Sequence, residues 1–416
     1  MSHSEADAEL SKSSLFDESL GIFALGYHLD RLRELALTGP LTIVYFHLPF
    51  VAAAEETGGW ELADHYHREA HATLRTLLLD RVGGACLIAP DGGNPDNLTA
   101  VFSGGESEHA EPDELALRLG GALQAELSRR LDGAATPLSA GARLLRPRND
   151  LRFDRQFRRV VASARAAALA ADAAGLQRET RDLSALIRSG AITTLYQPIF
   201  QIADRKVIGY EALSRGPGGE FHHPEALFAM AARTGLTPAL DALCQRSAAN
   251  MLPRLPDDVA LFVNASPLSF LTGSFDPGRF TAQFTDAGLD PAHIVIELTE
   301  RSSIDDFTAF GKTMRQLKKA GFRLAIDDVG SGFSSLQTIS ETEPEYIKID
   351  RALVDGLDRS PIKREIVRNL ARIGRTTRIA VIAEGVERDE ELSELAKIPV
   401  HLAQGFLFAQ PGAIPA

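Results

Sequence analysis

The sequence from Ile192 onward alternates short apolar runs with longer amphipathic stretches, and this alternation limits the possible folds more than any other feature. Runs with the composition of strands lie at residues 192–200, 207–213, 259–264, 294–298, 323–327, 346–349, 380–383 and 403–408. Helix-like stretches lie between most of them, at residues 225–234, 238–255, 305–320 and 362–376. Eight strands that alternate with helices in this way predict an α/β fold, a (β/α)8 barrel of the TIM type.

The preceding part of the chain has a different pattern. We expect strands at residues 41–46, 85–89, 98–102 and 138–145, and helices at residues 52–79, 111–131 and 153–174. This order predicts a smaller α/β or α+β domain at residues 21–175, followed by the barrel at residues 176–416. Residues 1–20 are rich in Ser, Asp and Glu, and we expect them to form a flexible tail.

Composition narrows the possible functions. The chain of 416 residues has 44 Lys and Arg against 56 Asp and Glu, a formal net charge of -12. This acidic balance argues against general binding of DNA, which needs a basic surface. The two cysteines, Cys86 and Cys244, cannot form a disulfide framework or a cysteine zinc site. The sequence shows neither a signal peptide nor a membrane-spanning stretch, so we expect a cytoplasmic protein that does not bind membranes.

Oxygen-bearing side chains recur where the predicted barrel strands end. They are Glu211, Asn264, Glu297, Asp327, Asp328 and Glu384, and Lys348 accompanies them in the sixth strand. A polar residue at a single strand end is usually part of a solvated turn. Because the active site of a (β/α)8 barrel lies at the C-terminal ends of its strands, recurrence at that end favours one shared site.

The chemistry of these side chains points to metal ions. Carboxylate and amide oxygens, with no Cys or His at the strand ends, select Mg²⁺ or Mn²⁺ over zinc. Carboxylates held together repel one another unless cations neutralise them. Two such ions can activate a water molecule and stabilise both oxygens of an in-line phosphoryl displacement. Some other metal-dependent (β/α)8 enzyme remains the generic alternative at this point.

Two positions need a particular local geometry. Neighbouring residues on a strand point to opposite faces, so Asp328 must lie just past the strand end if it is to bind together with Asp327. The chain would turn there, at Gly330 and Gly332, and the apolar residues before the pair make a simple capping role a poorer interpretation. Lys348 is flanked by two isoleucines, and alternation turns its side chain into the barrel mouth, where it could orient a water or contact phosphate.

A family resemblance rests on these residues. Glu211-Ala212-Leu213, followed by Arg215, resembles the signature of the EAL domain family, the cyclic di-GMP phosphodiesterases. Further matches in the same order are Tyr196-Gln197-Pro198-Ile199, Asn264, Glu297-Leu298-Thr299-Glu300, Asp327-Asp328, Lys348-Ile349-Asp350, Glu384-Gly385-Val386-Glu387 and Gln404-Gly405-Phe406-Leu407-Phe408. The resemblance implies hydrolysis of the bacterial second messenger cyclic di-GMP to linear pGpG, with two Mg²⁺ or Mn²⁺ ions per active site.

The resemblance also implies roles for individual residues. The metal ligands would be Glu211, Asn264, Glu297 and Asp327 for the first ion, and Asp327, Asp328 and the nearby Glu384 for the second. The catalytic residues would be Lys348, which positions the attacking water, together with Glu384, Glu300 and Glu387. The substrate would be bound by Gln197, Glu211, Leu213, Arg215, Asp350 and Gln404. The family further implies a homodimer formed through the EAL domain.

The loop after the aspartate pair departs from the family pattern. The family usually has Asp-Asp-Phe-Gly-Thr-Gly-Tyr-Ser-Ser-Leu, whereas this chain has Val329, Ser331 and Phe333 at the variable positions. We expect activity to survive, because both acids and both glycines remain.

The domain at residues 21–175 resembles a GGDEF-type cyclase domain in its strand order. The place of that family's metal-binding Asp is taken by Phe46-His47-Leu48-Pro49-Phe50, and Gly92-Gly93-Asn94-Pro95-Asp96 lacks the acidic pair of the family's hairpin. We therefore expect a degenerate domain that regulates the barrel. A PAS-like or GAF-like sensory domain is the alternative. For the whole chain, the alternative is a catalytically silent cyclic di-GMP receptor or a protein-interaction module.

Overall fold

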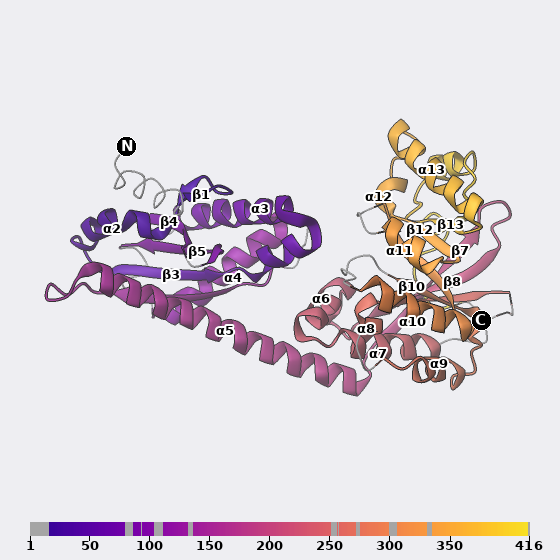
Figure 1. Ribbon diagram of the computed structural model, residues 1–416, viewed down its shortest axis with the longest axis horizontal. Coiled ribbons are helices and arrows are strands. Elements are labelled where there is room, and N and C mark those ends of the chain that lie inside the picture. Colours follow the sequence, from indigo (N-terminus) through magenta and orange to yellow (C-terminus); the bar gives the residue numbers. More distant parts are fainter. Residues whose placement is uncertain are drawn as a thin grey trace. The chain divides into compact units, whose positions relative to one another are not determined.

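The computed structural model describes residues 16–79, 86–92, 94–103, 111–131, 136–250, 256, 258–271, 275–298, 306–330 and 335–414. The chain divides into two compact units, Met1–Arg178 and Glu179–Ala416, drawn in Figure 1. The helix α5 (Phe153–Ser189) runs across this boundary. Its first part therefore belongs to the first unit, and its last turns belong to the second.

A four-stranded antiparallel sheet forms the centre of the first unit. Its strand order is β4 (Cys86–Asp91), β5 (Asn94–Phe102), β3 (Leu41–His47) and β6 (Ser139–Leu145). The central strand β3 reads LTIVYFH, and its first six residues are buried. A strand that is apolar on both faces needs cover on both sides of the sheet.

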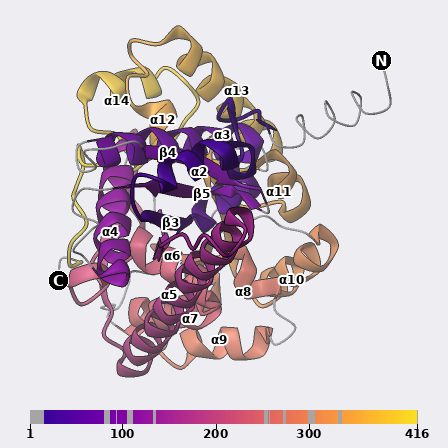
Figure 2. The ribbon, with the colours of Figure 1, turned by 90° about the vertical axis from the view of Figure 1, so that its left-hand side faces the viewer.

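Helices cover both faces of this sheet (Figure 1; Figure 2). On the face that carries Val44 and Phe46 lie α3 (Pro49–Leu79) and α4 (Pro112–Arg130). On the face that carries Ile43 and Tyr45 lie α2 (Leu29–Ala36) and the first part of α5. The helix α3 is kinked at Gly59, whose φ of 77° lies in the left-handed region that glycine tolerates.

A short hairpin precedes the sheet. The strands β1 (Phe16–Asp17) and β2 (Ile22–Phe23) pair antiparallel, and η1 (Leu25–His28) follows. The composition predicts a flexible tail through residue 20, whereas residues 16–20 belong to this hairpin; residues 1–15 lie outside the described part. The ring of Phe16 packs edge-on against Phe23 with 5.1 Å between centroids. Phe23 also stacks on Tyr27 and Leu20 packs against the core of the first unit, so several apolar contacts hold this segment.

The second unit is a closed barrel of eight strands, as the sequence predicts. In chain order they are β7 (Thr193–Gln201), β8 (Val207–Arg215), β9 (Ala260–Ala265), β10 (Ile294–Leu298), β11 (Arg323–Val329), β12 (Tyr346–Ile349), β13 (Ala380–Ala383) and β14 (Leu402–Ala403). The strands β8 to β14 are parallel, but β7 is antiparallel to both of its neighbours. The link from β7 to β8, residues 202–206, is too short for the crossover that parallel neighbours need.

Helices surround the barrel and bury a continuous apolar layer against it. They are α6 (Pro224–Thr234), α7 (Thr237–Asn250), α8 (Pro267–Leu271), α9 (Pro277–Thr285), α10 (Phe307–Lys319), α11 (Ser335–Thr342), α12 (Arg351–Val354), α13 (Pro361–Thr377) and α14 (Asp389–Leu395), with short turns η3 (Gly219–Phe221) and η4 (Pro291–His293). Inside the barrel, Phe262, Val295 and Ile382 are buried in a second cluster. The interior is therefore a packed core, and the site must lie at one end of it.

The last turns of α5 pack on this unit. Leu183 and Leu186 are buried against Leu227 of α6 and Leu240 of α7. In addition, the guanidinium of Arg233 binds a carboxylate of α5, Glu179, at 2.8 Å. The end of the long helix is thus fixed to α6 and α7 by both apolar and ionic contacts.

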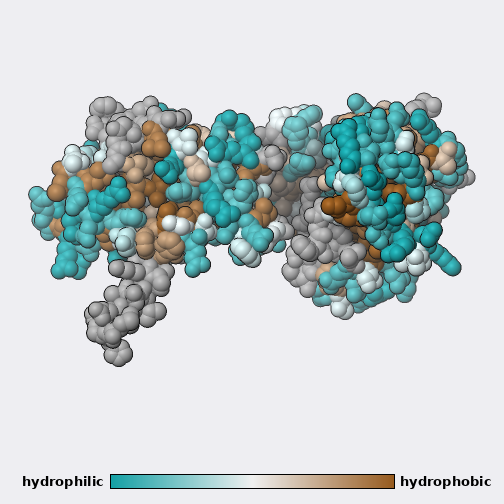
Figure 3. Space-filling model, turned by 90° about the horizontal axis from the view of Figure 1, so that it is seen from above, coloured by the Kyte–Doolittle hydropathy of each residue, from teal (hydrophilic) through white to brown (hydrophobic). Residues whose placement is uncertain are grey.

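Hydrophilic side chains cover most of the face seen in Figure 3, with separate hydrophobic patches on each unit. Within the described ranges, every helix is either too short or too polar to cross a bilayer.

Candidate active site

One lysine gathers four carboxylates at the C-terminal end of the barrel. The Nζ atom of Lys348 lies 2.6 Å from Glu384 Oε1, 2.9 Å from Glu297 Oε1, 3.2 Å from Asp327 Oδ1 and 3.3 Å from Glu211 Oε2. Its side chain is 1% exposed. The acids come from different strands or strand ends, so the barrel itself brings the cluster together.

Strand register explains why these side chains meet. Glu297 of β10 pairs directly with Asn264 of β9, so the two lie side by side on the inner face. Glu211 of β8 pairs with Phe262, two residues before Asn264 and therefore on the same face. Lys348 follows the alternation of β12, opposite to its two buried isoleucine neighbours, and enters the barrel mouth as the sequence predicts.

The aspartate pair is brought together by a bulge. The register of β11 on β12 shifts between Ile326 and Val329, where β11 has one residue more than its partner strand. Asp328 lies in this bulge with φ of 55°, in the left-handed region. The sequence analysis places Asp328 past the strand end, but β11 runs to Val329. The bulge, which precedes Gly330, cancels the alternation that would send Asp327 and Asp328 to opposite faces.

The same bulge creates a group of three acids. One carboxylate oxygen each from Asp327, Asp328 and Glu384 lies within 4.8 Å of the other two. Among the described residues, both oxygens of Glu297 and Oδ1 of Asp327 are buried; Lys348 lies beside Glu297 Oε1 and Asp327 Oδ1, and Glu297 Oε2 has no donor. Buried carboxylate oxygens without donors are acceptors for a cation, so this donor set fits divalent metal ions with oxygen ligands.

The electrostatics of the cluster reflect its burial. Burial raises the pKa values of Glu297 and Glu384 well above the usual range of a carboxyl. The charge of Lys348 opposes this shift, while the other carboxylates of the cluster add to it. Burial by itself lowers the pKa of Lys348, but the four surrounding carboxylates outweigh it and raise that pKa well above its usual value. One ammonium group thus partly balances several acids.

Gln404 binds Glu211 directly, and Gln197 binds Gln404. Gln404 donates from Nε2 to Glu211 Oε2 at 2.6 Å and to Gln197 Oε1 at 3.0 Å. Gln197 donates in turn to the carbonyl of Ala409 at 3.0 Å. Asn264 Nδ2 lies 3.3 Å from Glu211 Oε1, so both oxygens of this carboxylate have amide donors. Gln197, Glu211, Asn264 and Gln404, separate in the sequence, form one connected group.

The remaining predicted residues lie around this centre. Arg215 ends β8 and donates to the carbonyl of Ser214 at 2.9 Å, and Leu213 on the same strand is half-buried. Asp350 caps α12, because its Oδ1 accepts from the backbone of Ala352 at 2.6 Å. Glu387 and Glu300 are the last two predicted residues. Glu387 forms an ion pair of 2.9 Å with Arg351, and Glu300 lies outside the described residues.

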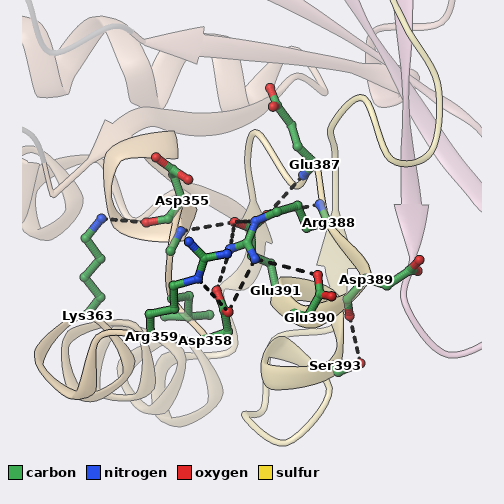
Figure 4. Close-up of polar contacts among 12 residues, drawn as sticks. Asp355, Asp358, Arg359, Lys363, Glu387, Arg388, Asp389, Glu390, Glu391 and Ser393 are labelled. Atoms are coloured by element: carbon green, nitrogen blue, oxygen red, sulfur yellow. Dashed lines mark hydrogen bonds and ion pairs between the residues drawn. The ribbon is translucent and has the colours of Figure 1, made fainter.

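The segment that leaves β13 is held by a network that the sequence analysis does not single out (Figure 4). The guanidinium of Arg388 donates to Asp358 Oδ1 at 2.5 Å and to Glu391 Oε1 at 2.6 Å. Glu391 is buried and accepts the backbone N–H groups of Glu387 and Arg388, each at 3.2 Å, and that of Gly356 at 3.1 Å. Glu391 stands at the third position of α14, as in a capping box, but the N-cap is Arg388 and not Ser or Thr, so the sequence carries only half of that signal.

Comparison with known proteins agrees with this arrangement. The family model of the EAL domain matches residues 180–411. PdeB of Escherichia coli, named as a probable cyclic di-GMP phosphodiesterase, is 29% identical over 241 residues, which cover 56% of this chain and 45% of PdeB. An uncharacterized protein of Mycobacterium tuberculosis, Rv1354c, is 27% identical over 434 residues, which cover 98% of this chain and 67% of that protein. This chain spans between 29% and 45% of the first curated relatives that it matches.

Solved structures give the same family. The PaMucR phosphodiesterase in complex with c-di-GMP matches with a TM-score of 0.50 and 26% identity, covering 56% of this chain and 97% of that one. The EAL enzyme Bd1971, in its form bound to cAMP and cyclic-di-GMP, matches with a TM-score of 0.54 over 77% of this chain and 79% of that one. Its identity of 20% supports the fold alone. Since the family model covers more than half of the sequence, the chain belongs to the EAL domain family.

Proposed function

We propose that this protein hydrolyses cyclic di-GMP to linear pGpG with divalent metal ions at the C-terminal end of its barrel. The observation that carries the proposal is the buried cluster of four carboxylates around the single ammonium of Lys348, in which Glu297 Oε2 has no donor. The names of relatives such as PdeB and PaMucR support the choice of substrate. The fit of the donor set to hard cations supports Mg²⁺ or Mn²⁺, two per site.

The proposed ligands are those that the family resemblance implies, and the second set is also supported by the grouping of oxygens from Asp327, Asp328 and Glu384. Glu211, Asn264, Glu297 and Asp327 would hold the first ion, and Asp327, Asp328 and Glu384 the second. When bound, the ions supply activation of a water molecule and stabilisation of charge on the phosphate oxygens. With its acidic partners engaged in that way, the ammonium of Lys348 can donate to the attacking water and hold its orientation.

The substrate contacts come from the ring of residues around the cluster. The Arg215 guanidinium, at the end of β8, suits a phosphate oxygen pair. The linked amides of Gln197 and Gln404 would hold the Glu211 ligand in place and would also bind the nucleotide. Leu213 and Asp350 complete the proposed substrate contacts, and the family resemblance implies catalytic roles for Glu387 and Glu300.

The organisation of the whole chain is also a proposal. The first unit would act as a degenerate GGDEF-like or sensory domain that regulates the barrel. The whole protein would lie in the cytoplasm, where a second messenger acts. A homodimer through the barrel unit is supported by exposed isoleucines of α13, where Ile362 is 73% exposed and Ile366 and Ile373 lie on the same helix face. The molar mass in solution, measured by light scattering, tests this point for wild type and for Ile362→Lys.

Turnover is the direct test of the proposed activity. Purified protein is incubated with cyclic di-GMP and Mg²⁺, Mn²⁺ or EDTA, and the products are separated by chromatography. We expect pGpG only with metal, and none from Glu211→Ala. Asp258→Ala is the matched control, because it removes an exposed carboxylate at the opposite end of the barrel, where Asp258 pairs with Lys206. Binding of cyclic di-GMP without any product would refute the proposal and indicate a receptor.

A further inference from the structure

Two buried polar residues of α7 contact the end of β9. Asp241 and Gln245 are each 3% exposed, and they lie four residues apart on one face of the helix. Asp241 Oδ2 accepts from the backbone N–H of Ser266 at 2.8 Å and from Ser269 Oγ at 2.5 Å. Gln245 Nε2 donates to the backbone carbonyl of Asn264 at 3.2 Å. The helix therefore holds the chain immediately before and after residue 265.

These contacts lie where β9 leaves the sheet. The ladder of β9 with β8 ends at the pair Ala212 and Val263, and the ladder with β10 ends at Ala265. From Asn264 onward, the backbone thus loses the support of its neighbouring strands within two residues. Asn264 is also the residue whose side-chain amide lies beside Glu211. At Asn264 the ladder with β8 has ended while the ladder with β10 continues, so α7 and β10 together fix the backbone groups on which the orientation of that amide depends.

We propose that Asp241 and Gln245 are positioning residues that set the orientation of Asn264 and thereby the affinity of the site for its first metal ion. The inference rests on the proposed function, because it takes Asn264 as a metal ligand. Neither residue touches the ion or the substrate. Both act through the backbone of residues 264–266.

The chemistry of α7 supports a specific role over simple packing. Burial of a carboxylate costs free energy unless hydrogen bonds compensate it, and an apolar residue at position 241 would pack without that cost. The neighbours Leu240, Leu243 and Cys244 are apolar and buried, so the helix does not need a charge for its stability. Gln245 is itself held in place, because its Oε1 accepts from Gln283 Nε2 at 3.0 Å. Because both polar atoms of the Gln245 side chain are hydrogen-bonded, this side chain holds the carbonyl of Asn264 in a defined position.

The test measures metal affinity without substrate. Wild type, Gln245→Leu, Asp241→Ala and Asp241→Asn are titrated with Mn²⁺, and free Mn²⁺ is followed by electron paramagnetic resonance. We expect Gln245→Leu and Asp241→Ala to weaken Mn²⁺ binding by about 10-fold or more, the usual effect of removing a group that orients a ligand. Asp241→Asn keeps an acceptor for the Ser266 N–H, so its affinity should stay within about 2-fold of wild type.

A control on the same helix separates positioning from stability. Ser247 of α7 donates to the carbonyl of Ile192, next to β7. Its replacement by Ala therefore removes a different contact of the same helix. Ser247→Ala should lower the unfolding temperature while its Mn²⁺ affinity stays unchanged. Because Asp241→Ala opens a buried cavity and can fail to fold, the decision rests on Gln245→Leu, with folding checked by circular dichroism.

The outcomes distinguish this inference from the proposed function. A folded Gln245→Leu variant that binds Mn²⁺ as tightly as wild type overturns the inference, even if the protein is an active phosphodiesterase. Weakened Mn²⁺ binding in Gln245→Leu, with normal binding in Ser247→Ala, supports it even if cyclic di-GMP is not hydrolysed. Absence of Mn²⁺ binding by wild type overturns both.

Discussion

Asn264 of β9 and Glu297 of β10 lie directly opposite each other in a parallel ladder at the mouth of the barrel. On the other side of Asn264, its amide Nδ2 lies 3.3 Å from a carboxylate oxygen of Glu211. A neutral amide therefore separates two acids on three successive strands. This order limits the repulsion between carboxylates when no metal is bound.

Replacement of that amide by a third acid should expose the repulsion. Without metal, we expect Asn264→Asp to lower the free energy of unfolding by about 1–3 kcal/mol, because a like charge joins a buried cluster. Cations offset the added charge, so Mn²⁺ should raise the Tm of Asn264→Asp by more than that of wild type. Thermal unfolding in EDTA and in Mn²⁺ measures both effects. Asn264→Ala is the control, and equal Tm values of Asn264→Asp and wild type in EDTA would contradict the prediction.

Removal of the central ammonium should have the largest effect on the metal-free protein. Lys348→Met leaves four carboxylates without their shared cation, and the loss of one partner from a buried ion pair costs about 3–5 kcal/mol. We expect a fall of that size in urea unfolding with EDTA, and partial recovery with Mn²⁺. Turnover should stay low even at saturating metal, since the proposed donor to the water is absent. Lys206→Met, at an exposed ion pair, should unfold like wild type.

Asp241 predicts a pH dependence of stability. Burial raises the pKa of this carboxyl to about 7, against the donors Ser269 and Ser266, which lower it. Because the folded protein then holds a proton that the unfolded chain releases near pH 4, stability falls as the pH rises towards 7, by about 1.4 kcal/mol per pH unit for this group. Above pH 7 the contribution becomes constant.

The variant Asp241→Asn isolates this contribution, since its amide does not titrate. We expect the difference in unfolding free energy, variant minus wild type, to increase between pH 5 and pH 7 and to level off above pH 7. Urea unfolding at four pH values measures it. The adjacent Cys244 does not interfere, because burial raises its pKa to about 12. A difference that is independent of pH would show that Asp241 is ionised throughout.

The network around Glu391 predicts a graded set of variants. Glu391→Ala leaves three backbone N–H groups without their acceptor, and we expect a loss of about 2–3 kcal/mol in urea unfolding. Arg388→Met removes ion pairs to Asp358 and Glu391 but leaves the backbone hydrogen bonds of Glu391 intact, so it should lower stability less than Glu391→Ala. Glu390→Ala is the matched control, because this exposed acid lies 3.6 Å from Arg388 and should change stability by less than about 0.5 kcal/mol. Equal losses in Glu391→Ala and Glu390→Ala would contradict this account.

The barrel could be predicted because its strands carry a strong local signal. Runs such as Ile294–Leu298 and Tyr346–Ile349 are mostly buried and carry a single charged residue each, Glu297 and Lys348, so they stand out from the amphipathic helices. The acids at their ends are visible for the same reason, as polar residues directly after apolar runs. Lys348 follows from alternation alone.

Other features depend on relations that a local pattern does not contain. The bulge at Asp328 arises from the register of β11 on β12, and nothing in the residues 324–329 alone specifies it. The antiparallel direction of β7 follows from the length of one link, which is readable only when both strands are taken together. Asp241 and Gln245 do leave a trace, as polar residues at helical spacing on an otherwise apolar face. Their partner, however, is the end of a strand that only the fold brings to them.

The hairpin of β7 and β8 has a consequence for how the barrel folds. Gln197 and Glu211 are direct partners in its antiparallel ladder and are joined by a single short turn. Such a hairpin closes through local contacts within about 1–10 μs, whereas each parallel pair waits for a helical crossover to be ordered. We therefore expect one wall of the site to form early, as a template on which the slower parallel strands assemble. Changes in the turn at residues 202–206 should then alter the folding rate of the barrel more than the geometry of its finished site.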